Sequence, residues 1–234
     1  MTENPEAAKQ QVRERVWELL ARERVARFPG ARGRIPNFVG AEAAAEQLAT
    51  RREWKRAQVV KSNPDAPQLP VRRRALKDGK LLYMAVPRLA ERKPFVRVDV
   101  DPTIKRAMSQ GRPVALDEME PVELVVCGSV AVNRRGVRIG KGGGYSDLEF
   151  GLLVEADLVG AGTVLATTVH RLQVVDEDLP ETEHDFSVDL IVTPEEMIRT
   201  GARKRPPGIL WDHLDVEKVG SIPALAQRTI RPRS

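Results

Sequence analysis

Residues 123–158 read ELVVCGSVAVNRRGVRIGKGGGYSDLEFGLLVEADL, and this stretch decides the fold. The segment 123–132 is almost entirely apolar, which predicts a long buried strand. The turn 140–144 contains three consecutive glycines, which adopt backbone angles that other residues avoid. The segment 147–158 predicts a helix. A strand, a glycine turn and a helix in this order are typical of an α/β protein.

The rest of the chain alternates in the same way. The apolar pattern predicts further strands over 57–61, 80–86, 163–169 and 188–193. It predicts helices over 6–27, 41–54 and 71–78, and another opened by Pro194, since proline favours the first helical position. Together these elements predict a three-layer αβα domain around a mostly parallel sheet. Ligands bind such sheets at the carboxyl ends of the strands, so we expect the glycine turn near that edge.

The composition is globular, with 41% hydrophobic and 30% charged residues among 234. We expect one domain over 1–202 and an arginine- and proline-rich tail over 203–234. Apolar residues of the tail, such as Trp211, predict that part of it docks. No apolar run is long enough to span a membrane, so we expect no membrane partner and a cytoplasmic location.

The charge and the cysteine usage narrow the function further. The net charge of +5 suits an anionic small molecule such as a nucleotide, and it is also compatible with weak nucleic-acid binding. Nucleic-acid binding is disfavoured, because the chain lacks the interleaved aromatic residues of base-stacking platforms. The one cysteine, Cys127, lies in an apolar run, which predicts a buried structural thiol. We expect a monomer or a homodimer.

The glycine turn carries the strongest chemical signal. It does not fit the Walker pattern, because the Ser or Thr that should follow the lysine is absent. It does not fit the dinucleotide-binding pattern either, because the third glycine is absent. Gly142, Gly143 and Gly144 nevertheless allow backbone N–H groups to converge on a phosphate ahead of a helix. Arg138 and Lys141 add positive charge. Gly140 begins the turn.

Outside this turn the candidates leave alternatives open. Lys9 and Arg13 are spaced i,i+4 on the first helix, where they either face a neighbouring cleft or extend into solvent. Asp147 either caps the helix or holds a Mg²⁺ ion. His170, at the end of a strand, is a better functional candidate than His184, and both also fit a structural or surface role.

Two shorter loops complete the set of candidates. Asp65 lies in the sequence NPDAP, which predicts a turn former with a smaller chance of substrate contact. Asp185 lies beside His184 in the loop ETEHDFSVD, where no spacing indicates a zinc site.

The sequence RIGKGGGYSD resembles the signature of the 5-formyltetrahydrofolate cyclo-ligase family, also called methenyltetrahydrofolate synthetases. Lys9 and Arg13 resemble the Lys-x-x-x-Arg pair of its first helix, and VDLIVT at 188–193 resembles a late strand that carries an aspartate. The segments RIPNFVGA, NPDAPQLPVR and RPPGILWDHL look like a divergent subgroup, the methenyltetrahydrofolate synthase domain-containing proteins. The resemblance spans residues 9–198.

The resemblance implies an activity and a set of site residues. The activity is the ATP- and Mg²⁺-dependent conversion of 5-formyltetrahydrofolate to 5,10-methenyltetrahydrofolate. It implies that Lys9, Arg13 and the turn 140–145 bind the nucleotide and that Asp147 and Asp189 hold Mg²⁺. Lys141 and Tyr145 are then the residues expected to act directly on the reactants.

Departures from the family pattern keep other functions open. The second tyrosine of the signature is Ser146 here, and NPDAPQLP replaces the usual folate-side sequence. The alternatives are a nucleotide-binding paralogue that acts on a different substrate, or a non-catalytic protein that binds a nucleotide or RNA.

Overall fold

The computed structural model describes residues 4–201 and 204–229. An eight-stranded sheet at its centre has the order β11-β10-β8-β5-β1-β2-β3-β4. The strands are β1 (Val59–Ser62), β2 (Leu81–Ala85), β3 (Phe95–Arg97), β4 (Arg112–Val114), β5 (Leu124–Cys127), β8 (Val164–Thr168), β10 (Leu190–Val192) and β11 (Met197–Arg199). The inner strands from β10 to β2 run parallel, whereas β11, β3 and β4 are antiparallel. The predicted α/β class is confirmed.

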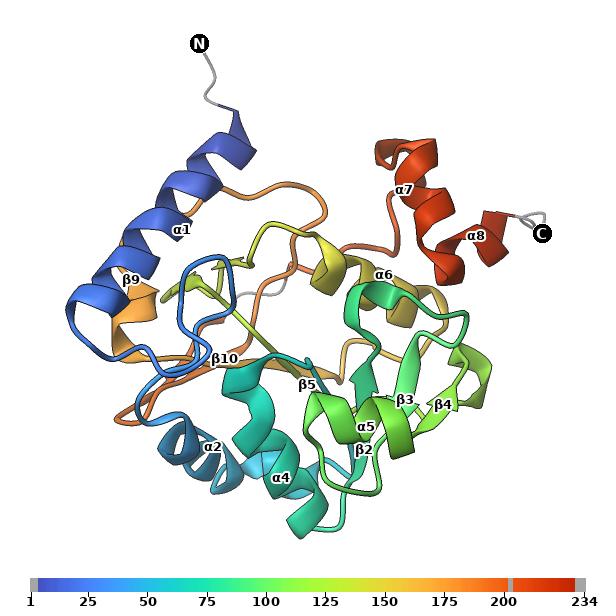
Figure 1. The fold of residues 1–234 in the computed structure, drawn as a ribbon, viewed down its shortest axis with the longest axis horizontal. Coiled ribbons are helices and arrows are strands. Elements are labelled where there is room, and N and C mark those ends of the chain that lie inside the picture. Colours follow the sequence, from blue (N-terminus) through green and yellow to red (C-terminus); the bar gives the residue numbers. More distant parts are fainter. Residues whose placement is uncertain (1–3, 202–203, 230–234) are drawn as a thin grey trace.

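Helices cover both faces of the sheet (Figure 1). One face carries α2 (Ala41–Ala49), α3 (Arg52–Arg56), α4 (Leu69–Lys77) and α5 (Ile104–Gln110), and the other carries α6 (Tyr145–Glu155). The two layers follow from the alternation of side chains along each strand. Val60 of β1 packs into the α2–α4 core, whereas its neighbour Val59 packs into the α6 core.

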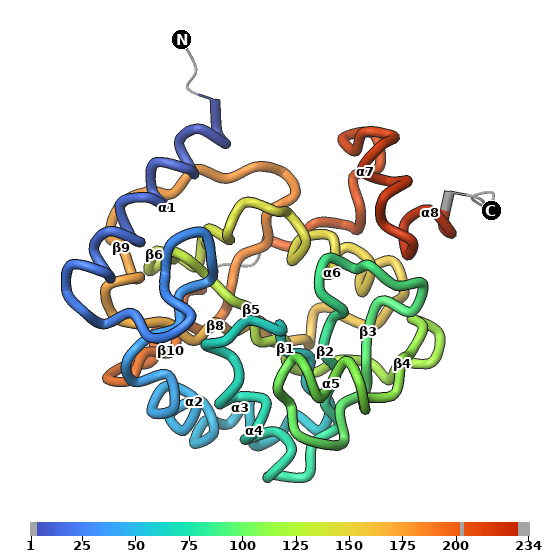
Figure 2. Tube along the Cα trace, viewed as in Figure 1, coloured from blue at the N-terminus to red at the C-terminus, as the bar shows by residue number. Residues whose placement is uncertain are grey.

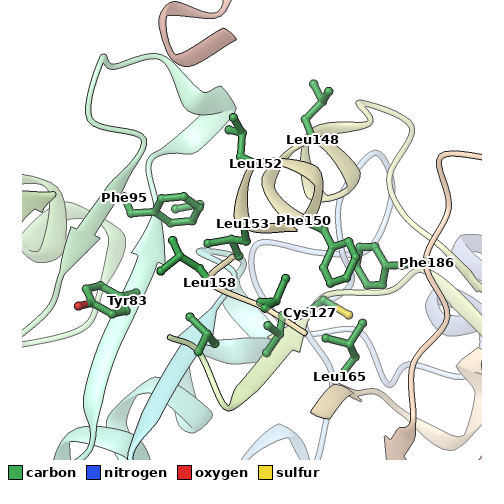
Figure 3. Packing of buried hydrophobic residues seen from close by; sticks show 14 of the residues in the cluster. Tyr83, Phe95, Cys127, Leu148, Phe150, Leu152, Leu153, Leu158, Leu165 and Phe186 are labelled. Atoms are coloured by element: carbon green, nitrogen blue, oxygen red, sulfur yellow. The ribbon is translucent and has the colours of Figure 1, made fainter. Parts of the chain in front are cut away.

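Helix α6 is apolar on nearly every side, as expected of a helix buried between two layers. Leu152 and Leu153 are fully buried between the sheet and the C-terminal segment. Phe150 packs against Phe186 with 4.8 Å between the ring centroids (Figure 3). This packing holds the start of α6, and the glycine turn before it, in a fixed position.

The strand predicted over 123–132 is wrong beyond Cys127. Strand β5 ends there, and the chain continues into a second sheet of β6 (Ala131–Asn133), β7 (Arg138–Ile139) and β9 (Val174–Val175), on which α1 (Pro5–Arg22) packs. The break falls at Gly128, where a methyl group would lie 2.8 Å from Ile35 Cγ2. An uninterrupted apolar run does not distinguish one strand from two. The glycine turn consequently follows β7 of the smaller sheet.

Other predicted helices also end differently. The helix predicted from Pro194 is wrong, because β11 pairs antiparallel with β10 there. The Thr193 hydroxyl accepts the N–H groups of Glu195 and Glu196, which closes the turn. The helix predicted over 41–54 is interrupted by the extended backbone of Arg51. The first helix ends at Arg22, five residues before its predicted end.

The C-terminal segment 204–229 packs over α6 (Figure 2). It contains α7 (Val216–Ser221) and α8 (Pro223–Thr229). Ile222, Ala224 and Leu225 are buried in the same core as α6. The expected boundary after residue 202 falls outside the described residues. Within the described ranges, no helix combines the length and the apolar character needed to cross a bilayer.

Candidate active site

A cavity of about 870 Å³ opens beyond the carboxyl ends of β1, β2 and β5. Its walls come from α1, the glycine turn with the start of α6, the loop 182–185, and the C-terminal segment 208–218. Its volume lies within the range of about 300–1,000 Å³ that small-molecule sites occupy. The cavity therefore lies at the sheet edge where α/β proteins bind ligands.

The glycine turn forms one edge of this cavity. Gly142 and Gly144 have φ angles of 102° and 66°, in the region that favours glycine. A methyl group on Gly142 would lie 3.4 Å from the Nη1 of Arg13, and one on Gly144 would lie 3.4 Å from the Nζ of Lys218. Gly144 is also the N-cap of α6. The turn thus presents bare backbone, a helix N-terminus and two cations in one place, which suits an anion.

Helix α1 projects Lys9 and Arg13 into the cavity, where their exposed fractions are 6% and 3%. Lys9 Nζ donates to Asp185 Oδ2 at 2.5 Å. Arg13 Nε donates to the Gly140 carbonyl at 2.8 Å, and its Nη1 donates to Glu6 at 2.6 Å. Of the two alternatives, the inward-facing one is the arrangement found.

Asp185 is a cavity residue whose role the sequence did not reveal. Burial raises the pKa of its carboxyl group, but hydrogen bonds from Lys9 and from the Thr182 N–H outweigh burial and hold the pKa below the ordinary value of 3.8. Asp185 is therefore a carboxylate at neutral pH. Its sequence neighbours gave no sign of this, because its partner Lys9 lies 176 residues away.

Arg138 and Asp147 form a second ion pair, with 2.8 Å between Nη2 and Oδ1. The guanidinium group also lies 4.2 Å from the ring centroid of Phe186, and its buried Nε has no hydrogen-bond partner among the described residues. Burial raises the pKa of Asp147 more than Arg138 lowers it. The capping alternative for Asp147 is wrong, because Gly144 is the N-cap and the Asp147 side chain bonds Arg138 instead.

The two residues predicted to be catalytic both reach the cavity. Lys141 is half-exposed, and its Nζ lies 3.5 Å from Asp65 Oδ1. Tyr145 is half-buried, with its ring against Gly143, where a methyl group would lie 2.9 Å from Tyr145 Cδ2. Asp65 therefore contributes to the cavity wall as well as to its turn.

A polar chain below the glycine turn was not predicted. Lys61 of β1 pairs with Glu149 of α6, and its Nζ also donates to Asn63 Oδ1 at 2.7 Å. Asn63 in turn donates to the Ser146 hydroxyl at 3.2 Å. Asn63, Ser146 and Glu149 line the cavity. The available signal was one charged residue inside each of two otherwise apolar runs, at Lys61 and at Glu149.

Asp189 lies away from the cavity. It precedes β10, at the amino end of that strand, and is not among the residues lining the cavity. Its Oδ2 accepts from the Leu165 N–H at 2.8 Å and from Arg205 at 2.7 Å. The structure thus separates the two predicted metal ligands, and Asp185 is one of the carboxylates that share the cavity with Asp147.

The structure places His184, rather than the favoured candidate His170, at the cavity. His170 lies outside the cavity, accepts the Leu172 N–H at its Nδ1 and meets the ring of Phe38 edge-on. His184 lines the cavity, and its Nε2 lies 3.2 Å from Nδ1 of His213 in the C-terminal segment. The sequence favoured His170 for its position at the end of a strand, but its ring serves packing.

Comparison with known proteins identifies the family of the chain. The model of the 5-formyltetrahydrofolate cyclo-ligase family matches residues 5–194. The methenyltetrahydrofolate synthase domain-containing proteins of Bos taurus and Homo sapiens are 42% and 40% identical to the chain, over 93% and 97% of its length. The aligned parts span 61% and 62% of those proteins, so the chain covers less than two thirds of these relatives.

A solved structure supports the same fold. The 5,10-methenyltetrahydrofolate synthetase of Aquifex aeolicus superposes with a TM-score of 0.56 at 20% identity, over 83% of this chain and 93% of that one. The similarity to this structure therefore supports the fold as well as the sequence match. With a family match that covers most of its length, the chain belongs to the 5-formyltetrahydrofolate cyclo-ligase family.

Proposed function

We propose that the chain closes 5-formyltetrahydrofolate to 5,10-methenyltetrahydrofolate and consumes ATP in doing so. The observation that carries this proposal is the glycine turn, bracketed by inward-facing cations within a cavity at the carboxyl ends of parallel strands. Backbone N–H groups and the N-terminus of α6 suit the phosphates of a nucleotide. Family membership supplies the substrate class.

The reaction needs charge neutralisation and positioning more than a protein nucleophile. The formyl oxygen is a poor leaving group, and phosphoryl transfer from ATP converts it into one that departs as phosphate. N10 of the folate attacks the formyl carbon and releases its proton to solvent, and the C–O bond to phosphate then breaks. Lys9, Arg13 and Arg138 line the cavity, and we expect them to neutralise the phosphates, as cations do in other phosphoryl transfers. Lys141 adds a more exposed cation, and Tyr145 offers a ring for stacking on the heterocycle.

The residues fit Mg²⁺ in a limited way. Within the described ranges, no three His, Cys, Asp or Glu residues are grouped to hold a metal ion. Mg²⁺ commonly takes one or two carboxylates together with phosphate oxygens and water, and Asp147 and Asp185 line the cavity. Bound there, the ion would neutralise negative charge on the transferred phosphoryl group. Both carboxylates form ion pairs with basic side chains in this structure, so each would have to leave its partner to bind Mg²⁺.

The direct test measures ADP release with and without 5-formyltetrahydrofolate. We expect release that depends on the folate, together with formation of the methenyl product. Substitution of Lys141 by Met should raise the KM for ATP about tenfold, because a charge-assisted phosphate contact is lost. Its melting temperature should not change. Lys105→Met removes an exposed lysine from α5 and serves as the control.

ADP release that does not depend on the folate, or no ADP release at all, would contradict the cyclo-ligase proposal.

A second candidate, a nucleotide-dependent enzyme with another heterocyclic substrate, is favoured by one observation. Ser146 stands where the family signature has tyrosine, and it joins the polar chain through Asn63 to Lys61 and Glu149. Thermal unfolding with ATP, folates and other heterocycles separates the two candidates, since a ligand of the folded state raises the melting temperature.

A further inference from the structure

The C-terminal segment is built against α6 in a fixed register. At Gly151 a methyl group would lie only 2.8 Å from Ile209 Cγ1, so the close contact requires glycine. Glu155, at the end of α6, accepts the Ile209 N–H at 3.2 Å and Trp211 Nε1 at 2.8 Å. Arg228 of α8 bonds the other oxygen of Glu155 at 2.7 Å. These contacts set where the next part of the segment lies.

From this anchor the segment forms a wall of the cavity. Leu210, His213, Leu214 and Lys218 all line the cavity. His213 meets His184, whose loop also carries Asp185, with the ring centroids 5.0 Å apart. The segment thus joins α6 on one side of the cavity to the loop 182–185 on the other.

Helix α7 directs the ammonium group of Lys218 toward the glycine turn. Its Nζ would lie 3.4 Å from a methyl group on Gly144, the residue that opens α6. The side chain is partly buried, and within the described part of the chain Nζ has no hydrogen-bond or ion-pair partner. Lys9 and Arg13, in contrast, are both paired with carboxylates. A partly buried cation without a partner raises the free energy of the folded state, and an anionic ligand that pairs with it would offset that cost.

We propose that Lys218 is a phosphate-binding residue of this site and that segment 208–218 is the wall that completes it. The inference rests on the proposed use of ATP. Arg13 beside Gly142 and Lys218 beside Gly144 would then hold the phosphates from both sides of the turn. Lys218 lies beyond the residues that match the family model, so this cation is an addition from the C-terminal segment.

The test compares Lys218→Met with Lys218→Arg and with Lys77→Met. Lys77 is exposed at the end of α4, outside the cavity, and its loss changes the net charge equally. Titration calorimetry measures the Kd of each protein for ATP and for adenosine. We expect Lys218→Met to weaken the binding of ATP about tenfold, because one charge-assisted contact to phosphate is lost. The binding of adenosine, which has no phosphate, should not change. Lys218→Arg should recover most of the affinity for ATP, and Lys77→Met should bind ATP with the affinity of the wild type.

The outcomes separate the inference from the proposed function. Lys218→Met should melt at the wild-type temperature without ligand, because its Nζ bonds no other described group. If the wild type binds ATP and Lys218→Met binds it equally well, the inference is overturned and the proposed function stands. If Lys218→Met weakens the binding of ATP and of adenosine equally, Lys218 has a structural role and the inference is also overturned. A wild type that binds no ATP would overturn the proposed function itself.

Discussion

Helix α6 supplies one carboxylate to each of two buried ion pairs, and the pairs differ in their surroundings. Asp147 pairs with Arg138 beside the glycine turn, and its side chain keeps 19% of its surface exposed. Glu149 pairs with Lys61 against the sheet, and its side chain is 6% exposed. A more accessible pair can exchange partners with a ligand. We therefore propose that Asp147 takes part in the chemistry and that the Lys61–Glu149 pair holds α6 on the sheet.

The largest expected effect follows from breaking the more enclosed pair. Lys61→Met leaves the Glu149 carboxylate without its cation, and removal of one partner of a buried pair costs about 3–5 kcal/mol. We expect the free energy of unfolding, measured by urea denaturation, to fall by that amount. An unfolding free energy close to that of the wild type would show that this pair does not support the fold.

A matched control is available at Lys80, another buried lysine. Its Nζ donates to the backbone carbonyls of Trp54 and Ala57, at 2.8 and 2.6 Å, and to no carboxylate in the part of the chain that the structure describes. Lys80→Met should cost about 1–3 kcal/mol, as expected for lost hydrogen bonds. The double variant Lys61→Met with Glu149→Leu removes both charges and should recover most of the loss.

The next effect concerns the more accessible pair. Asp147→Asn should lower folate-dependent ATP turnover about 100-fold, as expected when one group that organises charge in the transition state is removed. Its effect on stability should be smaller than that of Lys61→Met, since the amide oxygen still accepts from Arg138. Steady-state kinetics and urea denaturation measure the two quantities. A variant that keeps its activity but loses 3–5 kcal/mol would reverse our assignment of the two pairs.

The smallest effect is a pH dependence at Glu149. Burial raises the pKa of Glu149 above its ordinary value of 4.5, in opposition to the charge of Lys61. The folded state therefore binds a proton more readily than the unfolded state, and this contribution to stability is lost as the pH rises through the folded pKa. The stability of the wild type minus that of Glu149→Gln should decline as the pH rises above 4.5. An increase over that range would contradict the direction of the shift.

Local patterns explain what could be predicted. The apolar strands and the helix after the glycine turn each depend on residues close together in the chain, whereas the sequence left open whether Lys9 and Arg13 face inward. The break at Gly128 could not be predicted, since the apolar run continues through it, and the neighbour that a methyl group there would meet, Ile35, is distant in the chain. The hairpin after Thr193 was missed for a related reason. Proline suits a helix start, but pairing with β10 decided the outcome.

By itself, the sequence determined an α/β fold and a glycine-rich turn ahead of a helix, because periodicity and glycine act through neighbouring residues. The tertiary structure decided which charges meet. It placed Asp185 rather than Asp189 beside Asp147, and it brought Lys61 to Glu149, 88 residues away. It also brought the end of the chain, with Lys218, to the turn near its middle. Such pairings follow from the folded path of the backbone, since charges far apart in sequence interact only when packing encloses them together.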